Sequence, residues 1–238
     1  MPISVEIVGE NASAGIDAVF EYFNTIDERF STYKQDSEVS RVNAGTLDRK
    51  DISAEFAEVL ALAEKTKQET TGYFDITRPS GGIDPSGIVK GWAIKKVAEL
   101  LASKGYENFC IDAGGDIAVA GVNASGGSWS VGIRNPFSHD EIVKVLYPKG
   151  KGVATSGSAA RGNHIYDPHD PAKPVEDIAS ITVVGPDILE ADRFATAAFA
   201  MGKGGIAFIE TLPGFEAYLI DAKGIATMTS GFNELTHA

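Results

Sequence analysis

The chain has 238 residues, of which 43% are hydrophobic and 23% charged, as in a globular protein rather than a disordered or fibrous one. Its 33 acidic residues outnumber 21 Lys and Arg, and the formal net charge is −12. This charge argues against nucleic acid as the main partner and against an anionic membrane surface, because both attract a basic face. A polyphosphate ligand would need local screening by a metal ion or by backbone amides.

Cys110 is the single cysteine, so the chain has no internal disulfide framework and no multi-thiolate zinc site. Its apolar neighbours indicate a buried strand thiol. The sequence has no run of 18 apolar residues, and residues 1–7 read as a strand rather than a signal peptide. We therefore expect a cytoplasmic protein, unless a leader was removed from this sequence.

The first half of the chain predicts one strand and three helices. Residues 3–8 alternate between polar and apolar, as a half-buried strand does. Residues 11–30 carry apolar side chains three and four positions apart, which predicts an amphipathic helix with Ser13 as N-cap. Further helices are expected over 53–69, capped by Ser53, and over 88–103, ended by Gly105.

The second half predicts strands near 108–112, 116–121, 128–133, 142–147 and 152–155. Short helices over 192–201 and 205–211 follow, and a hairpin over 215–221 and 224–229 ends the chain. Several strands follow one another with tight turns between them, which favours a mixed or mainly antiparallel sheet. We expect an α+β fold with packed helices, in a single domain over residues 1–238.

Two loops are candidates for function. Residues 71–87 are too rich in glycine and proline for regular structure, yet Tyr73, Phe74 and Ile76 make them too apolar for a solvated linker. Long ordered loops in compact domains are usually functional. Residues 168–174 form a second such loop.

Residues 84–91, Asp-Pro-Ser-Gly-Ile-Val-Lys-Gly, form a glycine-bearing loop that opens a helix. Backbone amides at a helix N-terminus suit phosphate. Lys90 in the first turn opposes the helix dipole, which suggests that it serves a ligand. The alternative is an ordinary loop-to-helix junction. Residues 112–116, Asp-Ala-Gly-Gly-Asp, similarly predict a tight hairpin or a backbone that passes close to a ligand.

Residues 153–168 bring hydroxyls, a histidine and a carboxylate close together in sequence. A hydrolase triad of Ser156, His164 and Asp167 is disfavoured, because the Gly-x-Ser-x-Gly motif is missing. His164 is a better candidate as a general base, because histidine titrates near neutrality. A structural, hydrogen-bonded histidine is the alternative.

Asp192 and Thr196 are four residues apart and share one face of a predicted helix. A carboxylate and a hydroxyl are hard oxygen ligands of the kind that Mg²⁺ prefers. The alternative is that Asp192 only caps the helix.

Taken in order, these motifs resemble the ApbE family of FAD:protein FMN transferases over nearly the whole chain. The resemblance rests on residues 30–39 (beginning Phe-Ser-Thr-Tyr), 72–77, 84–91, 112–116, 154–157, 164–168, and 191–192 with Thr196. The usual family loop reads Asp-Leu-Gly-Gly, whereas this chain has Pro85 and Ser86 after Asp84.

The resemblance implies an ApbE-like, T-fold-like architecture and a Mg²⁺-dependent transferase. Such enzymes split FAD, transfer FMN to a Ser or Thr hydroxyl of an acceptor flavoprotein, and release AMP. By resemblance, Asp192 is catalytic as a metal ligand, with Thr196 and the backbone oxygen of Gly87, and His164 activates the acceptor hydroxyl. The flavin nucleotide site maps by resemblance onto Tyr33, Asp75, Thr77, Asp84, Lys90 and Ile165.

Two other functions stay open. An FAD pyrophosphatase would use nearly the same site, with water in place of the acceptor, and would release free FMN and AMP. A flavin-binding protein without catalysis is the third possibility. Asp192, Thr196 and His164 argue against it, because a pure binder needs no metal site.

Overall fold

The computed structural model describes residues 1–158 and 165–237. Within this part of the chain, seven strands form one sheet in the order β1-β2-β3-β6-β7-β8-β9, and every neighbouring pair is antiparallel. These strands are β1 (Ile3–Ile7), β2 (Phe109–Ala113), β3 (Asp116–Ala120), β6 (Gly152–Gly157), β7 (Ile178–Gly185), β8 (Glu216–Asp221) and β9 (Ala226–Met228). The α+β, mainly antiparallel fold is thus confirmed, whereas the single domain over 1–238 stays a prediction.

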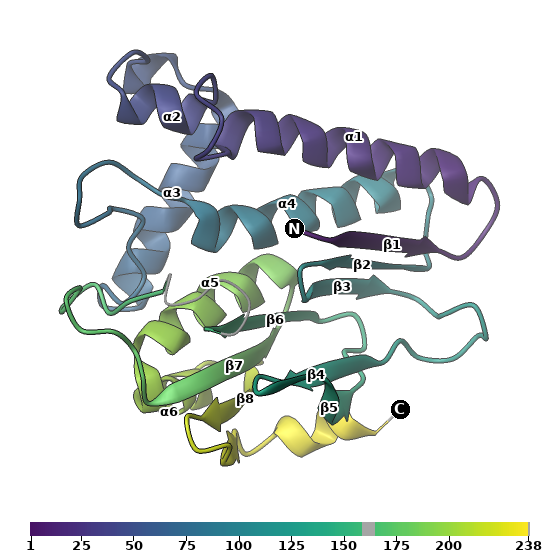
Figure 1. Cartoon of the computed structure of the whole chain (residues 1–238). Coiled ribbons are helices and arrows are strands. Elements are labelled where there is room, and N and C mark those ends of the chain that lie inside the picture. Colours follow the sequence, from purple (N-terminus) through teal and green to yellow (C-terminus); the bar gives the residue numbers. More distant parts are fainter. Residues whose placement is uncertain (159–164, 238) are drawn as a thin grey trace.

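The helices gather on one face of this sheet (Figure 1). They are α1 (Ala12–Phe30), α2 (Glu38–Asn43), α3 (Ala54–Glu69), α4 (Ser86–Ser103), α5 (Ile188–Ala200) and α6 (Gly205–Glu210). α4 packs on β2 and β3, α5 packs on β6 and β7, and α1 lies over α4 and β1. A core of aliphatic and phenylalanine side chains fills the space between sheet and helices.

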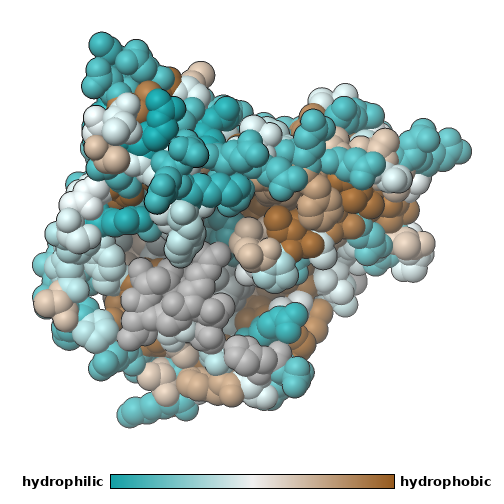
Figure 2. Space-filling model, turned by 45° about the horizontal axis from the view of Figure 1, so that its top comes forward, coloured by the Kyte–Doolittle hydropathy of each residue, from teal (hydrophilic) through white to brown (hydrophobic). Residues whose placement is uncertain are grey.

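The opposite face of β6–β8 is covered by a separate hairpin, β4 (Val131–Asn135) and β5 (Ser138–Leu146), and by a short 3₁₀ turn at Phe232–Thr236. Val131, Ile133 and Leu146 of the hairpin pack there with Val184 of β7. A further core lies among α1–α5, where Phe56 and Trp92 are fully buried. On the face seen in Figure 2, hydrophilic residues cover most of the surface over the helices, in keeping with the high charge of the chain.

Of the two predicted N-caps, Ser53 is confirmed and Ser13 is wrong. Ser53 caps α3 as predicted, because its hydroxyl accepts a hydrogen bond from the Phe56 amide at 3.1 Å. Ser13 does not cap α1, because that helix begins directly after Asn11, whose φ of 56° places it in the left-handed region. Asparagine tolerates this conformation better than most residues, so the chain turns there.

Two further predictions were wrong. The predicted elements include no strand between 155 and 192, yet β7 runs through Ile178–Gly185 and is buried along its whole length. Only residues 179–183 alternate between apolar and polar, and Ile178, Val184 and Gly185 do not continue that pattern, so the strand signal is short. The helix expected from Asp192 begins at Ile188, because the side chain of Asp187 accepts the Glu190 amide at 3.0 Å and caps it.

Candidate functional site

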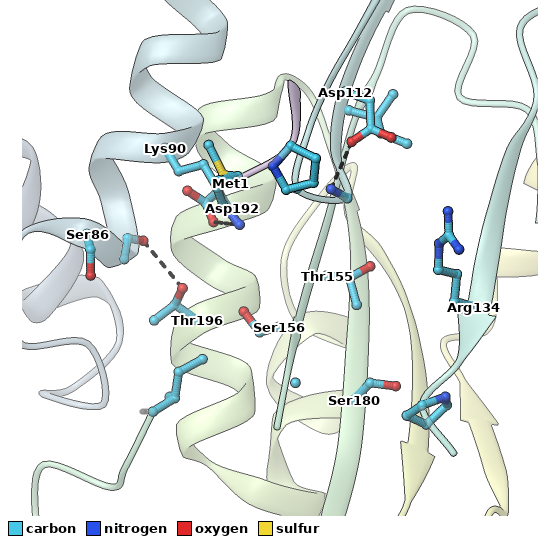
Figure 3. Close-up of a pocket in the computed structure, with 18 of the residues that line it drawn as sticks. Met1, Ser86, Lys90, Asp112, Arg134, Thr155, Ser156, Ser180, Asp192 and Thr196 are labelled. Carbon is cyan, nitrogen blue, oxygen red and sulfur yellow. Dashed lines mark hydrogen bonds and ion pairs between the residues drawn. The ribbon is translucent and has the colours of Figure 1, made fainter. Parts of the chain in front are cut away.

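A cleft of about 990 Å³ opens where α4, α5, the main sheet and the β4–β5 hairpin meet (Figure 3). Its floor is made by Thr155 and Ser156 of β6 and Ser180 of β7. Two loops, residues 73–84 and 165–168, also line it, and we call them the loop wall. The two loops that the sequence marked as functional therefore each contribute residues to one cavity.

The start of α4 and one face of α5 form the part of the cleft that we call the helical corner: Gly87, Lys90, Asp192 and Thr196. Thr196 Oγ1 donates to the carbonyl oxygen of Gly87 at 3.3 Å. Asp192 Oδ2 accepts the backbone amide of Gly91 at 2.7 Å. The structure thus brings together all three residues that the resemblance assigned to a metal.

Glycine at position 91 allows this close approach of α4 to α5. A Cβ atom on Gly91 would lie 2.6 Å from the Cβ of Asp192, well inside van der Waals contact. Asp192 itself is in the second turn of α5, and it is Asp187 that caps the helix. The carboxylate of Asp192 is therefore not used as a helix cap, which removes that alternative.

Lys90 reaches from α4 toward two buried carboxylates. Its Nζ lies 2.6 Å from Asp116 Oδ2 and 3.9 Å from Asp192 Oδ1. Because α4 begins at Ser86, Lys90 is in the second turn rather than the first, and the predicted conflict with the helix dipole was wrong. Asp116 instead accounts for the position of this lysine.

Burial dominates the electrostatics of the helical corner. Asp192 is 3% exposed and Asp116 is 1% exposed. Burial raises the pKa of Asp192 well above its ordinary value, the neighbouring Asp116 carboxylate raises it further, and Lys90 opposes both. The two buried carboxylates therefore face the same ammonium, that of Lys90.

A divalent cation fits this donor set. The Asp192 carboxylate, the Thr196 hydroxyl and the Gly87 carbonyl are hard oxygen donors, and Mg²⁺ commonly keeps water or phosphate in its remaining positions. Among the described residues there is no cluster of three or more His, Cys, Asp or Glu that could hold a metal. A site with one carboxylate is therefore incomplete without oxygen from water or substrate.

The loop wall carries its own ion pairs nearer the surface. Asp75 lies 2.7 Å from Lys67 Nζ and accepts the Thr77 amide at 2.8 Å. Partial burial raises the pKa of Asp75, but the hydrogen bonds from Lys67 and Thr77 outweigh it and the net shift is downward. Asp84 pairs with Arg78 at 3.1 Å. These carboxylates are thus held in place by neighbours within the loop wall or on α3.

The other predicted nucleotide-site residues divide into two groups. Ile165 lines the cleft with Asp75, Asp84 and Lys90. Thr77 is exposed beside the cleft and is not one of its lining residues, and Tyr33 is 95% exposed and lies outside it. His164 lies outside the described residues, so its role stays a prediction.

The structure also adds residues that the sequence reading missed. Arg134, exposed on β4, lines the cleft with Ser130 and Ile142 of the hairpin region. Asp167, the carboxylate of the disfavoured hydrolase triad, is hydrogen-bonded to His169 Nδ1 at 2.9 Å. The alternation of β4 marks Val131 and Ile133 as inward and Arg134 as outward, but only the tertiary fold shows that this outward face borders a cleft.

The fold itself is known from solved structures. The chain matches the ApbE protein from Thermotoga maritima with a TM-score of 0.86 and 21% identity, over 98% of this chain and 94% of that one. It matches the flavin transferase ApbE from Vibrio cholerae with a TM-score of 0.85 and 23% identity, over 98% and 95%. At these identities the likeness shows the fold, which is the ApbE fold.

Sequence comparison goes further. A relative from Haemophilus influenzae, an FAD:protein FMN transferase, is 26% identical over 98% of this chain and 86% of its own length. The enzyme of the same name from Vibrio cholerae is 26% identical over 79% of this chain and 72% of its own. The ApbE family model matches residues 1–81 and 78–219, so the chain belongs to the ApbE family. With these relatives it is identified as a transferase.

In the described part of the chain, none of the helices combines the length and the apolar character needed to span a bilayer.

Proposed function

We propose that this protein transfers FMN from FAD to a Ser or Thr hydroxyl of an acceptor flavoprotein and releases AMP. The observation that carries the proposal is the helical corner, where oxygen donors from Gly87, Asp192 and Thr196 converge beside Lys90. Relatives that share the family are named FAD:protein FMN transferases. A cleft of about 990 Å³ is also of a size suited to a dinucleotide.

The reaction replaces the phosphoanhydride bond of FAD with a phosphoester bond to the acceptor. The acceptor oxygen forms a bond to the phosphorus of the FMN half, and the bond from that phosphorus to the bridging oxygen breaks. AMP leaves with the bridging oxygen and its electron pair. The hydroxyl proton passes to a base, and we assign this role to His164 because a hydroxyl is a weak nucleophile at neutral pH.

Asp192, Thr196 and the Gly87 carbonyl would hold Mg²⁺ at the helical corner. When bound, the cation would offset charge on the pyrophosphate oxygens. This screening answers the problem that a net charge of −12 poses for a polyphosphate substrate. Lys90, Asp75, Asp84 and Ile165 line the cleft where they would contact FAD, and contacts from Tyr33 and Thr77 stay predictions.

The test is incubation with FAD, Mg²⁺ and an apo-flavoprotein acceptor, with the products resolved as AMP, free FMN and protein-bound FMN. We expect AMP and protein-bound FMN in equal amounts, linked through phosphate to Ser or Thr. Free FMN with AMP and no labelled acceptor would make the protein an FAD pyrophosphatase. Intact FAD would leave only flavin binding.

His164→Ala separates transfer from binding. A general base typically contributes about 10²–10⁴-fold, so flavinylation should fall by that factor while FAD and Mg²⁺ still bind. The wild-type rate should also fall on the acid side of neutrality as the imidazole is protonated. A wild-type rate in the variant, or flavin attached through its ring, would contradict the assignment and move the search for the base elsewhere.

A further inference from the structure

Asp116 is a buried carboxylate at the first position of β3, directly after the Gly114–Gly115 turn. Its Oδ1 accepts the backbone amide of Thr155 on β6 at 3.1 Å. Its Oδ2 is 2.6 Å from Lys90 Nζ. One oxygen is therefore fixed by the sheet, and the other holds a lysine that comes from α4.

The same lysine lies near a second carboxylate. Lys90 Nζ is 3.9 Å from Asp192 Oδ1, at the outer limit of an ion pair, while Asp192 Oδ2 accepts the Gly91 amide. Asp192 Oδ1 is thus the oxygen for which Lys90 and a cation would compete. The ammonium is 1.3 Å closer to Asp116 than to this oxygen (3.9 less 2.6 Å).

We propose that Asp116 is a positioning residue that keeps the Lys90 ammonium away from Asp192, so that Asp192 retains an oxygen for a divalent cation. Without the Asp116 charge, Asp192 would be the stronger of the two partners for Lys90, and charges in a buried site attract strongly. The ammonium would then close on Asp192 Oδ1 and occupy the place of the cation. The inference rests on the metal role in the proposed function and adds a residue that acts through Lys90.

Asp116→Asn tests this with little change in shape, because its side-chain oxygen can still accept the Thr155 amide. Mg²⁺ affinity is measured by calorimetry on the protein without FAD. We expect binding about tenfold weaker than wild type, a size usual for coupling between neighbouring groups. In Lys90→Met/Asp116→Asn the affinity should return to within about threefold of wild type, and Lys90→Met alone should change it by less than about threefold.

The double-mutant cycle separates this role from a structural one. Wild-type affinity in Asp116→Asn would overturn the inference, as would a double variant as weak as the single one, because Asp116 would then not act through Lys90. If the asparagine variant fails to fold, Asp116→Ser, which keeps an acceptor for Thr155, replaces it in the same cycle.

Asp221→Asn is the matched control. Asp221 is a buried carboxylate that pairs with Lys203 at 3.0 Å and accepts backbone amides, but on β8 and not among the residues that line the cleft. Its loss should leave Mg²⁺ affinity unchanged, and equal weakening in this variant would overturn the inference. If the wild-type protein binds no Mg²⁺, both the metal part of the proposed function and this inference are contradicted. If the wild type binds Mg²⁺ and Asp116→Asn binds it equally well, only the inference is contradicted.

Discussion

The helical corner and the loop wall face the same cleft but are built differently. Asp192 and Asp116 are almost fully buried and are fixed by backbone amides and one lysine from other elements. In the loop wall, the side chains of Asp84 and Arg78 are each about a third exposed, and their pair joins residues six apart. The oxygen atoms of the helical corner are thus fixed by packing, whereas the loop wall is held by contacts nearer the surface.

The largest expected effect lies in the helical corner. Asp192→Ala should lower flavinylation by about 10³-fold, because a metal that stabilises developing charge supplies several kcal/mol. FAD binding should persist, since most of the lining residues lie elsewhere in the cleft. Covalent FMN transfer and quenching of flavin fluorescence measure the two effects. Unchanged activity, or full activity of the wild type in excess EDTA, would contradict the metal assignment.

Arg193→Met tests whether the packing around the helical corner contributes more to stability than the ion pairs of the loop wall. Its buried guanidinium pairs with Glu69 and Glu190 and donates to Thr66 Oγ1 at 3.2 Å, which ties α5 to α3. Arg193→Met should lower the free energy of unfolding by about 2–3 kcal/mol, below the usual cost for a fully buried pair because the glutamates are partly exposed.

Arg78→Met in the loop wall is the matched control for Arg193→Met. Both side chains of its pair with Asp84 are about a third exposed, so solvent screens the pair and the loss should stay below about 1 kcal/mol. Urea unfolding of both variants gives the comparison. Equal losses would show that the two regions are held with similar strength.

Thr196→Val tests how much the uncharged hydroxyl of Thr196 contributes to the rate of flavinylation. The hydroxyl donates to the Gly87 carbonyl and would contribute one metal oxygen, but it carries no charge. We expect flavinylation about fivefold lower, a milder loss than in Asp192→Ala, because a net hydrogen bond is worth about 1 kcal/mol. Rates for both variants at saturating Mg²⁺ decide the order, and a loss as large as that of Asp192→Ala would contradict it.

The smallest effect concerns the Lys67–Asp75 pair. The pKa of Asp75 is lowered despite partial burial, and Asp75 raises the pKa of Lys67. The pair therefore stabilises the fold above the unfolded pKa of Asp, about 4, and below that of Lys, about 10.4. This stability is lost as the pH falls through the folded pKa of Asp75 or rises through that of Lys67.

Lys67→Met measures this pair. Between those limits it should cost less than about 1 kcal/mol, because Lys67 is partly exposed. The difference from wild type should shrink in acid and in strong base, which urea unfolding over a pH series would show. A difference that does not shrink as the pH falls below the unfolded pKa of Asp, about 4, would contradict the role of Asp75.

The sequence predicted the elements whose periodicity is local. α1, α3 and α4 followed from apolar spacing, and the Asp112–Asp116 turn followed from its glycines, whose φ values of 66° and 92° suit few other residues. Asp192 and Thr196 were proposed as metal ligands because they are one helical turn apart, and Gly87 was added by resemblance.

Features that depend on distant partners were missed or misjudged. β7 is buried along its whole length by neighbours that the tertiary fold sets, and only residues 179–183 alternate between apolar and polar. Residues 112–116 predicted a tight hairpin or a backbone close to a ligand, but not the pairing of Asp116 with Lys90, which is 26 residues away (116 less 90). Tyr33 was assigned by resemblance alone, and its side chain is almost fully exposed outside the cleft.

The β4–β5 hairpin leaves the main sheet after β3 and returns at β6, and these two strands are neighbours that pair at Ile117 and Val153. A connection between two adjacent strands can change length without moving the strands themselves. Closing a longer loop costs only about 0.6 kcal/mol for each doubling of its length. Insertions near Pro136 and Phe137 would therefore reshape the Arg134 side of the cleft while α4 and α5 stay in place. In evolutionary terms, the shape of the hairpin side can vary while the helical corner is kept.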